Sequence, residues 1–451
     1  MTGSFHNLKI SILLLLIAGY LVFSYSFMQL RIPPTGVGAP LGELALASIL
    51  FTVNVPKVLS RIGTVMPLPL LLFWWSWGFA RLIVDAIGEG LWAFRDATQL
   101  IETLYIVVGF ALFVGPEQTS RLSRWLRGII IVSCLYGLLF VVGNTLAAIS
   151  PTLSGGSGQA IPILGTFATS GTMLLLGAFY CMTLPRGSGF SSLWPTLTAG
   201  FLVSYAIVVM QTRTIYLQLL CLAALMLVFR PSALRRLGFA IPVLCFAVTI
   251  ATVFEIRVAG RLSSEISWSF LWDHVQSIFG VGSKGGVGEA AAGVPLRLGW
   301  WLRLYQELTS DPVALVSGLG FGIALTDFRD TLGTLAREPH NSVISVFGRL
   351  GVVGGICWLW IQIALFRVGY HAYHACARLR RSEESRLVLL TMALAVLILA
   401  GCLGEDIMEK PYHAVPYYAL WGVVLRIAYN VRKAPPLPPA YADQMPVRGS
   451  P

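Results

Sequence analysis

The residues of this sequence best suited to chemistry are His340 and Asn341, which stand side by side where a charged segment gives way to a long apolar run. A neutral imidazole has its pKa near neutrality and can accept a proton from an alcohol, so His340 is a candidate general base. The alternative is a structural histidine that only hydrogen-bonds to its surroundings. Asn341 can either cap the helix that begins at the apolar run or orient His340, and capping is the favoured interpretation.

Two arginines beside apolar runs are candidates for binding an anionic group. Arg213 lies between two apolar runs that are almost end to end, and Arg297 lies four residues before Trp301 in a basic, aromatic segment. A guanidinium keeps its charge and binds phosphate oxygens bidentately, so both arginines suit a phosphorylated substrate. The alternatives are a snorkelling helix-end side chain for Arg213 and a lipid-headgroup contact for Arg297.

A third arginine, Arg349, lies roughly two and a half helical turns into the apolar run that follows the histidine. A charge at such depth is costly and needs a partner or a cavity. An ion pair of Arg349 with Glu405 or Asp406 is favoured over a phosphate contact. The neighbouring Gly351 and Gly354 are interpreted as small residues that allow close helix packing.

The composition places these residues in a membrane protein, because 56% of the 451 residues are apolar and only 12% are charged. The apolar residues form blocks of roughly 20, the length that crosses a bilayer as a helix with all backbone hydrogen bonds internal. We therefore predict an all-α, polytopic membrane protein with about 12 transmembrane helices. The expected spans are residues 10–30, 40–56, 64–84, 97–115, 128–149, 166–184, 194–212, 214–229, 237–254, 342–366, 387–404 and 414–429.

These spans form two groups separated by one long connection. Residues 1–254 hold transmembrane helices 1–9, residues 342–429 hold helices 10–12, and residues 255–341 connect the two groups. Connections of that length are usually functional, so the long loop is where catalytic elements are expected.

The long loop should contain ordered elements of its own. Aromatic and polar residues mix over 261–279, which predicts an amphipathic helix at the membrane surface. A flexible, glycine-rich stretch is expected over 281–295, and a second amphipathic helix from Pro295 to Asp311. The sequence SGLGFG, residues 317–322, predicts a glycine turn.

The basic residues predict how the chain crosses the membrane. Lysine and arginine concentrate in alternate short connections, which places those connections and both termini in the cytoplasm and the long loop on the outer face. The first apolar block is expected to be a retained helix rather than a signal peptide, and the proline-rich residues 430–451 a disordered cytoplasmic tail. Topology accounts for the net charge of +11, so no nucleic-acid partner is expected.

The cysteine and metal-ligand patterns predict neither disulfides nor a metal site. All seven cysteines fall in predicted spans or cytoplasmic loops, where disulfides are not expected. The histidines and carboxylates show no ligand spacing along the sequence.

Four of these elements together resemble a known family. HNSVISVFGRLGVVG, residues 340–354, is similar to the His-Asn and spaced-glycine pattern of the O-antigen ligase and O-antigen polymerase superfamily of bacterial envelope glycan enzymes. RLGWW, residues 297–301, resembles its Arg-x-x-x-Trp element, GLGFG, residues 318–322, its Gly-x-Gly element, and QTR, residues 211–213, its helix-start arginine. The chain departs from the superfamily at Arg349, where an acidic residue is common.

The resemblance implies an enzyme of the bacterial inner membrane that works at the periplasmic face. Such an enzyme moves glycan from undecaprenyl pyrophosphate to a sugar hydroxyl of lipid A core, with inversion and without a metal or other cofactor. The expected roles are general base for His340, diphosphate binding for Arg213 and Arg297, and support for Asn341, Trp301 and Arg349. The alternatives are a polymerase that acts on lipid-linked repeats and, from a different class, a transporter or flippase.

Overall fold

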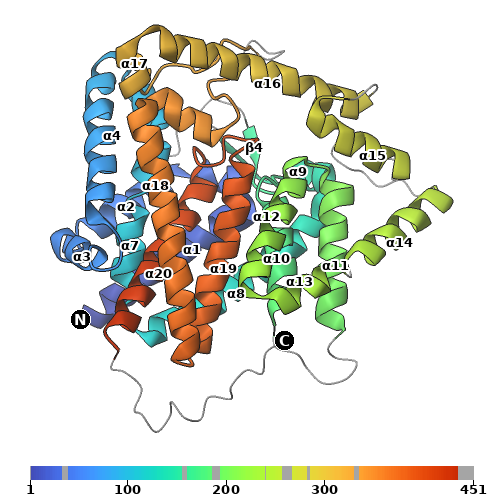
Figure 1. Ribbon diagram of the computed structural model, residues 1–451, viewed down its shortest axis with the longest axis horizontal. Coiled ribbons are helices and arrows are strands. Elements are labelled where there is room, and N and C mark those ends of the chain that lie inside the picture. Colours follow the sequence, from blue (N-terminus) through green and yellow to red (C-terminus); the bar gives the residue numbers. More distant parts are fainter. Residues whose placement is uncertain are drawn as a thin grey trace.

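The computed structural model describes residues 2–32, 39–154, 160–184, 193–238, 240–255, 267–281, 285–329 and 335–434. Within this part of the chain the fold is a helical bundle, as predicted (Figure 1). Two short antiparallel hairpins add to it, β1 (Arg31–Ile32) with β2 (Ala39–Pro40) and β3 (Thr152–Ser154) with β4 (Ala160–Pro162).

The helices before the long loop overlap the predicted apolar blocks. They are α1 (Thr2–Met28), α2 (Leu41–Leu50), α3 (Val55–Ile62), α4 (Leu68–Glu89), α5 (Leu91–Asp96), α6 (Thr98–Glu102), α7 (Tyr105–Leu112), α8 (Pro116–Leu138), α9 (Gly143–Ile149), α10 (Ser170–Thr183), α11 (Trp194–Tyr205), α12 (Thr214–Phe229), α13 (Pro231–Leu237) and α14 (Ala240–Val253). Of these, α5, α13 and the first half of α8 lie in segments that were predicted to be connections.

The remaining helices belong to the long loop and to the last group. They are α15 (Trp268–Gln276), α16 (Gly285–Ser310), α17 (Pro312–Ser317), α18 (Ser342–Arg378), α19 (Ser382–Gly401) and α20 (Pro411–Arg432). Helix α18 continues well beyond the predicted end at residue 366, because Leu365, Val368, Ala372 and Cys376 stay buried at helical spacing. Helix α20 includes the first residues of the predicted tail, of which residues 435–451 lie outside the described residues.

Six helices in the described residues are long and apolar enough to cross a membrane. They are Phe5–Met28, Leu68–Glu89, Pro116–Ile149, Pro231–Val253, Ser342–Arg378 and Ser382–Gly401. A seventh span results if α2 and α3, which are bent by 92° to one another, count as one. These helices support the prediction of an all-α membrane protein, whereas the number of twelve spans and the side on which the long loop lies stay predictions.

Helix α20 forms the centre of the bundle, and small residues let α7 cross it closely. A Cβ atom at Gly109 of α7 would lie 2.0 Å from the carbonyl oxygen of Ala419, and one at Gly422 would lie 2.3 Å from that of Ile106. Backbones that approach this closely maximise van der Waals contact in a setting where the hydrophobic effect gives little help. Helix α20 is therefore a rigid base for the loop that precedes it.

Helix α18 has a kink at Gly351, whose φ of 67° lies in the left-handed region. At this break the carbonyls of Gly348 and Arg349 accept hydrogen bonds from outside the helix, from the N–H groups of Leu319 at 2.7 Å and Gly320 at 3.1 Å. The predicted glycine turn thus supplies N–H donors for carbonyl groups that the kink leaves without a partner in α18.

The fit between the turn and the kink requires glycine on both sides. A Cβ atom at Gly351 would lie 2.3 Å from the carbonyl oxygen of Val316, and one at Gly318 would lie 2.3 Å from that of Arg349. Gly318 and Gly320 also have positive φ angles, of 79° and 98°. The prediction that Gly351 serves close packing is confirmed, although its contact is with α17 and the turn.

The long loop is more regular than its glycine content suggests. Helix α15 falls inside the predicted amphipathic segment, whose residues 261–266 lie outside the described residues. The predicted flexible stretch is wrong from Gly285 onward, because α16 begins there and continues through Pro295. A glycine costs about 1 kcal/mol relative to alanine in a helix, and packing routinely overrides that preference. Helix α16 lies across the end of the bundle at which α18 begins (Figure 1).

Candidate functional site

The start of α18 is fastened to the loop between α19 and α20, residues 402–410. Asn341 caps α18, because its Oδ1 accepts hydrogen bonds from the N–H groups of Val343 at 3.0 Å and Ile344 at 3.1 Å. Its amide nitrogen donates to the carbonyl oxygen of Leu403 at 3.1 Å. The capping interpretation of Asn341 is confirmed, and the same side chain also fixes the 402–410 loop.

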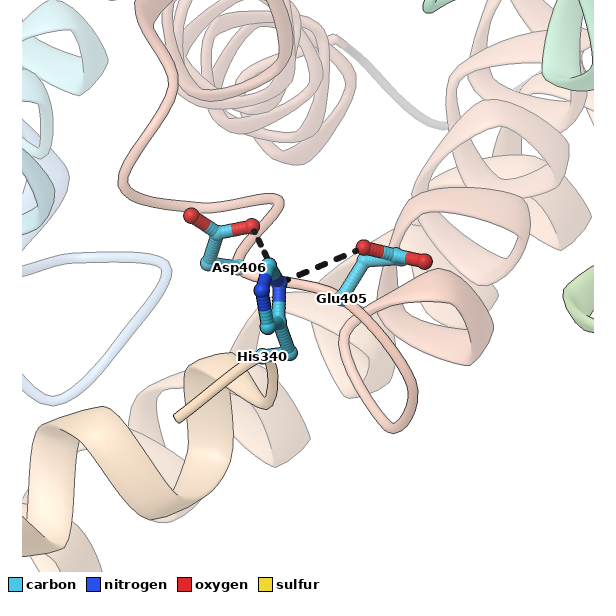
Figure 2. A group of neighbouring side chains, drawn as sticks. All are labelled: His340, Glu405 and Asp406. Carbon is cyan, nitrogen blue, oxygen red and sulfur yellow. Dashed lines mark ion pairs between the residues drawn. The ribbon is translucent and has the colours of Figure 1, made fainter. Parts of the chain in front are cut away.

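His340 precedes this cap and faces two carboxylates of the 402–410 loop. Its Nδ1 lies 3.6 Å from Oε2 of Glu405 and 3.5 Å from Oδ1 of Asp406 (Figure 2). The φ of His340 is 52°, in the left-handed region that residues other than glycine seldom adopt. Strained backbone of this kind persists where its surroundings fix it, and it is common at functional sites.

Helix α16 fixes the chain just before the histidine. Nε1 of Trp301 donates a hydrogen bond to the carbonyl oxygen of Pro339 at 2.8 Å. The neighbouring Trp300 ring is 6.0 Å from the His340 ring, centroid to centroid. Trp301 therefore holds the backbone from which His340 projects.

The two carboxylates change the protonation of His340. Asp406 first and Glu405 second raise the pKa of His340 to about 9, although burial opposes the shift. The imidazole is therefore protonated at pH 7, whereas the sequence alone suggested a neutral one. Burial raises the pKa of Asp406, but His340 and Lys410 outweigh it and hold that pKa well below its usual range.

Arg297 meets the same carboxylate as His340. Its Nη1 donates to the carbonyl oxygen of Gly404 at 2.7 Å, and its Nη2 lies 3.6 Å from Oε1 of Glu405. At the other end, Nζ of Lys410 lies 2.8 Å from Oδ2 of Asp406. Positive and negative groups therefore alternate, in the order Arg297, Glu405, His340, Asp406 and Lys410, and we call these five residues the charge chain.

The charge chain is open to solvent on one side. The side chains of His340 and Glu405 are 34% and 38% exposed, and that of Arg297 is 24% exposed. The imidazole, the guanidinium and the shared carboxylate are therefore each partly accessible.

Arg213 lies at a helix break, as predicted, and its helix touches the same loop. A π-helical turn, Ala206–Met210, ends at Gln211 with φ 49°, and Arg213 is the N-cap residue of α12. A Cβ atom at Gly404 would lie 3.0 Å from Cγ2 of Thr214, so the start of α12 abuts the loop that binds Arg297. Helix breaks with π turns are frequent at functional sites.

Arg213 also fastens the long loop. Its Nη1 donates to the carbonyl oxygen of Ser277 at 2.9 Å, just after α15. On the same side, His274 is fully buried and its Nδ1 lies 3.0 Å from the hydroxyl of Tyr216. Burial first and the Arg213 charge second lower the pKa of His274 to about 4, so this histidine is neutral. Sequence reasoning did not single out His274, which stands in an amphipathic segment among aromatic residues.

The predicted pairing of Arg349 with Glu405 or Asp406 is wrong, although the expectation of an ion pair holds. Nη2 of Arg349 lies 3.0 Å from Oδ2 of Asp96 and 2.9 Å from Oε1 of Glu338. The kink and the glycine turn direct Arg349 toward α5 and away from the 402–410 loop. Its guanidinium is nearly inaccessible and contacts Asp96 and Glu338, not the charge chain.

The glycine turn lies inside this buried network. Nη2 of Arg337 lies 2.9 Å from Oδ2 of Asp96, which also accepts a hydrogen bond from the N–H of Gly322 at 3.1 Å. On α4, Arg81 pairs with Asp85 at 3.0 Å, and Asp85 accepts from the N–H of Phe321 at 2.7 Å. The turn that supplies donors to the kinked helix is thus itself fixed by charged side chains.

Sequence reasoning considered Glu405 and Asp406 only as partners of Arg349 and missed their contact with His340. Glu405 and Asp406 belong to CLGEDIMEK, residues 402–410, an acidic cluster between two apolar runs on the same predicted side as His340. Ligand atoms of His340, Glu405 and Asp406 all lie within 4.8 Å of one another, close enough to share a divalent cation. Arg297 and Lys410 already lie against the other oxygens of these carboxylates, so two positive side chains match the two negative ones before a proton or a metal ion is added.

Comparison with known proteins adds no assignment. No model of a known protein family matches the chain, and a search of curated proteins finds no match.

Proposed function

We propose that this protein is a glycosyltransferase of the O-antigen ligase and polymerase type. It would transfer a glycan from undecaprenyl pyrophosphate to a sugar hydroxyl, with lipid A core as the favoured acceptor, at the periplasmic face of the bacterial inner membrane. The observation that carries the proposal is the shared carboxylate: Glu405 lies 3.6 Å from both the His340 imidazole and the Arg297 guanidinium. The start of α12, with Arg213, abuts the same loop.

The imidazole has the geometry of a general base oriented by carboxylates. With Nδ1–H directed at Glu405 and Asp406, Nε2 is left to take the proton of the acceptor hydroxyl. The acceptor oxygen then forms a bond to the anomeric carbon, and the bond from that carbon to the diphosphate oxygen breaks. Attack opposite the leaving group inverts the anomeric configuration.

Departure of the diphosphate is the step that the arginines assist. The electron pair of the broken bond leaves with the diphosphate, and the growing negative charge needs fixed positive partners. Arg297 holds two acceptors, a carbonyl and a carboxylate, that a diphosphate can replace. The donor carries its own activated leaving group, so this mechanism needs no metal and no protonation of the leaving oxygen.

The two carboxylates serve the histidine once it has accepted the proton. An imidazolium between Glu405 and Asp406 is stabilised by both negative charges, as in the Asp-His pair of serine hydrolases. The same stabilisation keeps His340 protonated at pH 7 when no substrate is bound. The proton on His340 must therefore leave before each turnover.

The direct test is transfer by the purified protein from a lipid-linked glycan to a lipid A core acceptor. His340→Ala should lose 10²- to 10⁴-fold in transfer rate and keep donor binding. Arg297→Gln should weaken donor binding and transfer together. Arg303→Gln, six residues further along α16 and exposed, makes the same charge change away from the charge chain and should match the wild type.

The competing functions give different results. A flippase should move lipid-linked glycan across proteoliposomes, and His340→Ala should leave that movement unchanged. Cells without a ligase should carry uncapped core and accumulate long lipid-linked polymer, whereas cells without a polymerase should carry single repeats. Wild-type transfer by His340→Ala protein would reject the proposed mechanism.

A further inference from the structure

A groove at the end of the bundle opposite α16 and α17 is independent of the proposed glycan chemistry. It lies between the start of α4, the second half of α18 and the end of α20, and its volume is about 690 Å³. Leu70 of α4, Trp360 and Ile363 of α18, and Val431 of α20 are among its apolar walls. Trp360 and Ile363 are 57% and 56% exposed, so this part of the groove is open to the surroundings of the bundle.

The basic residues of the groove form one stripe along α18. Arg367, His371, His374 and Arg378 all line it, and their spacings of four, three and four residues put them on one face of the helix. Trp360 precedes this stripe by two helical turns on the same face. Since a helix rises about 1.5 Å per residue, Trp360 and Arg378 are about 27 Å apart along the axis. The groove is thus apolar toward the middle of the bundle and cationic toward its end.

The positive charge of the groove has no acidic counterpart in the described part of the chain. None of the described lining residues is an aspartate or a glutamate. Arg367 and Arg378 form no ion pair with any described residue, and Nε2 of His374 is buried without a hydrogen-bond partner there. On the opposite wall, Arg432 donates to the carbonyl oxygen of Thr64 and adds a further cation.

We propose that this groove binds an anionic diacyl phospholipid. Its acyl chains would pack on Trp360 and Ile363, and its phosphate would lie on the basic stripe that runs from Arg367 to Arg378. Basic pockets between membrane helices select anionic headgroups through this combination of apolar wall and unpaired cations. The groove lies among the connections that the positive-inside rule places in the cytoplasm, so the ligand comes from the inner leaflet.

The test compares phosphatidylglycerol with phosphatidylcholine of the same acyl chains, added to the full chain in detergent and counted by native mass spectrometry. Wild-type protein should retain the anionic lipid preferentially, and Arg367→Gln with Arg378→Gln should lower that preference roughly 10- to 30-fold, from about 1 kcal/mol per basic residue. Arg127→Gln with Arg235→Gln removes two arginines of the same predicted side outside the groove and should leave the preference unchanged.

A second measurement needs no charge change. Brominated acyl chains quench tryptophan on contact, so brominated phosphatidylglycerol should quench the wild type more than Trp360→Phe at concentrations where brominated phosphatidylcholine shows no difference. Equal retention of both lipids by the wild type would overturn the proposal. The same loss of lipid preference in the Arg127→Gln, Arg235→Gln control as in the Arg367→Gln, Arg378→Gln variant would also overturn it. Full competition by glycerol phosphate, which has no acyl chains, would also overturn the proposal. A lipid preference that appears only after deletion of residues 435–451 would overturn it as well, because it would assign the groove to the chain's own C-terminal segment.

Discussion

Nδ1 of His340 lies 3.5 Å from Oδ1 of Asp406, and this separation sets the protonation state of the candidate base. The second oxygen of that carboxylate is held by Lys410 at 2.8 Å, so Asp406 stays ionised and keeps its position. A histidine with an ionised carboxylate on each side is a stronger base than a free one and is also more often protonated. Both consequences can be measured.

The first prediction concerns the protonation of His340. Diethylpyrocarbonate acylates only neutral imidazole, and with a pKa of about 9 the neutral fraction of His340 at pH 7 is on the order of 1%. Asp406→Asn removes the largest cause of the raised pKa, so the pKa should fall and acylation at pH 7 should increase several-fold. Peptide mass spectrometry after short labelling gives the rate.

The control for this labelling is Asp273→Asn, which changes an exposed carboxylate on α15. It should leave the acylation rate of His340 unchanged. Acylation of His340 at the rate of an unperturbed histidine in the wild type would contradict the ion pairs seen at the site.

The second prediction is the pH dependence of transfer. If neutral His340 is the base, kcat/KM should rise with pH and level off near pH 9, because the raised pKa keeps the imidazole protonated below that value. Asp406→Asn lowers the pKa, so the rising limb should move to lower pH while the plateau rate falls. A wild-type profile that is flat from pH 6 to pH 9 would assign proton removal to another group.

The third prediction tests the kink in α18. Gly351→Ala places a methyl group 2.3 Å from the Val316 carbonyl oxygen at a φ of 67°, and it should lower the free energy of unfolding by about 1–3 kcal/mol. The matched control is Gly128→Ala in α8, where an added Cβ has no described neighbour within 4 Å. That change should be neutral or stabilising by up to about 1 kcal/mol. Unfolding in mixed micelles measures both, and equal effects would show that the kink is not sterically required.

The sequence predicted those features that depend on local pattern. The helical blocks, the cap at Asn341, the break before Arg213 and the glycine turn each follow from residue types at fixed short spacings. The start of α16 is not predicted because glycines argue against a helix locally, whereas the helix as a whole contacts α17, α18 and residues 277–279. Local rules cannot include such contacts.

The charged pairs show the other limit of sequence reasoning. Arg349 and Asp96 are far apart in the chain and meet only because the kink at Gly351 redirects α18 onto the glycine turn. The sequence favours Glu405 or Asp406 as the partner of Arg349. In the structure Glu405 lies near His340 and Arg297, and Asp406 near His340 and Lys410.

The last prediction concerns the buried Arg349. Its side chain is 4% exposed and those of Asp96 and Glu338 are 1% and 9% exposed, so Arg349→Met leaves Glu338 buried without its cation and Asp96 with Arg337 as its remaining partner. Removing one partner of such a pair costs about 3–5 kcal/mol. Arg303→Met, whose pair with Glu307 is exposed, should cost less than about 1 kcal/mol.

If Arg349 acts through Glu338, adding Glu338→Gln to Arg349→Met should cost less than the two single changes together, because the second change removes an unpaired charge. Additive losses, or an Arg349→Met protein as stable as the Arg303→Met control, would show that the network behind the glycine turn is not what holds α18 in place.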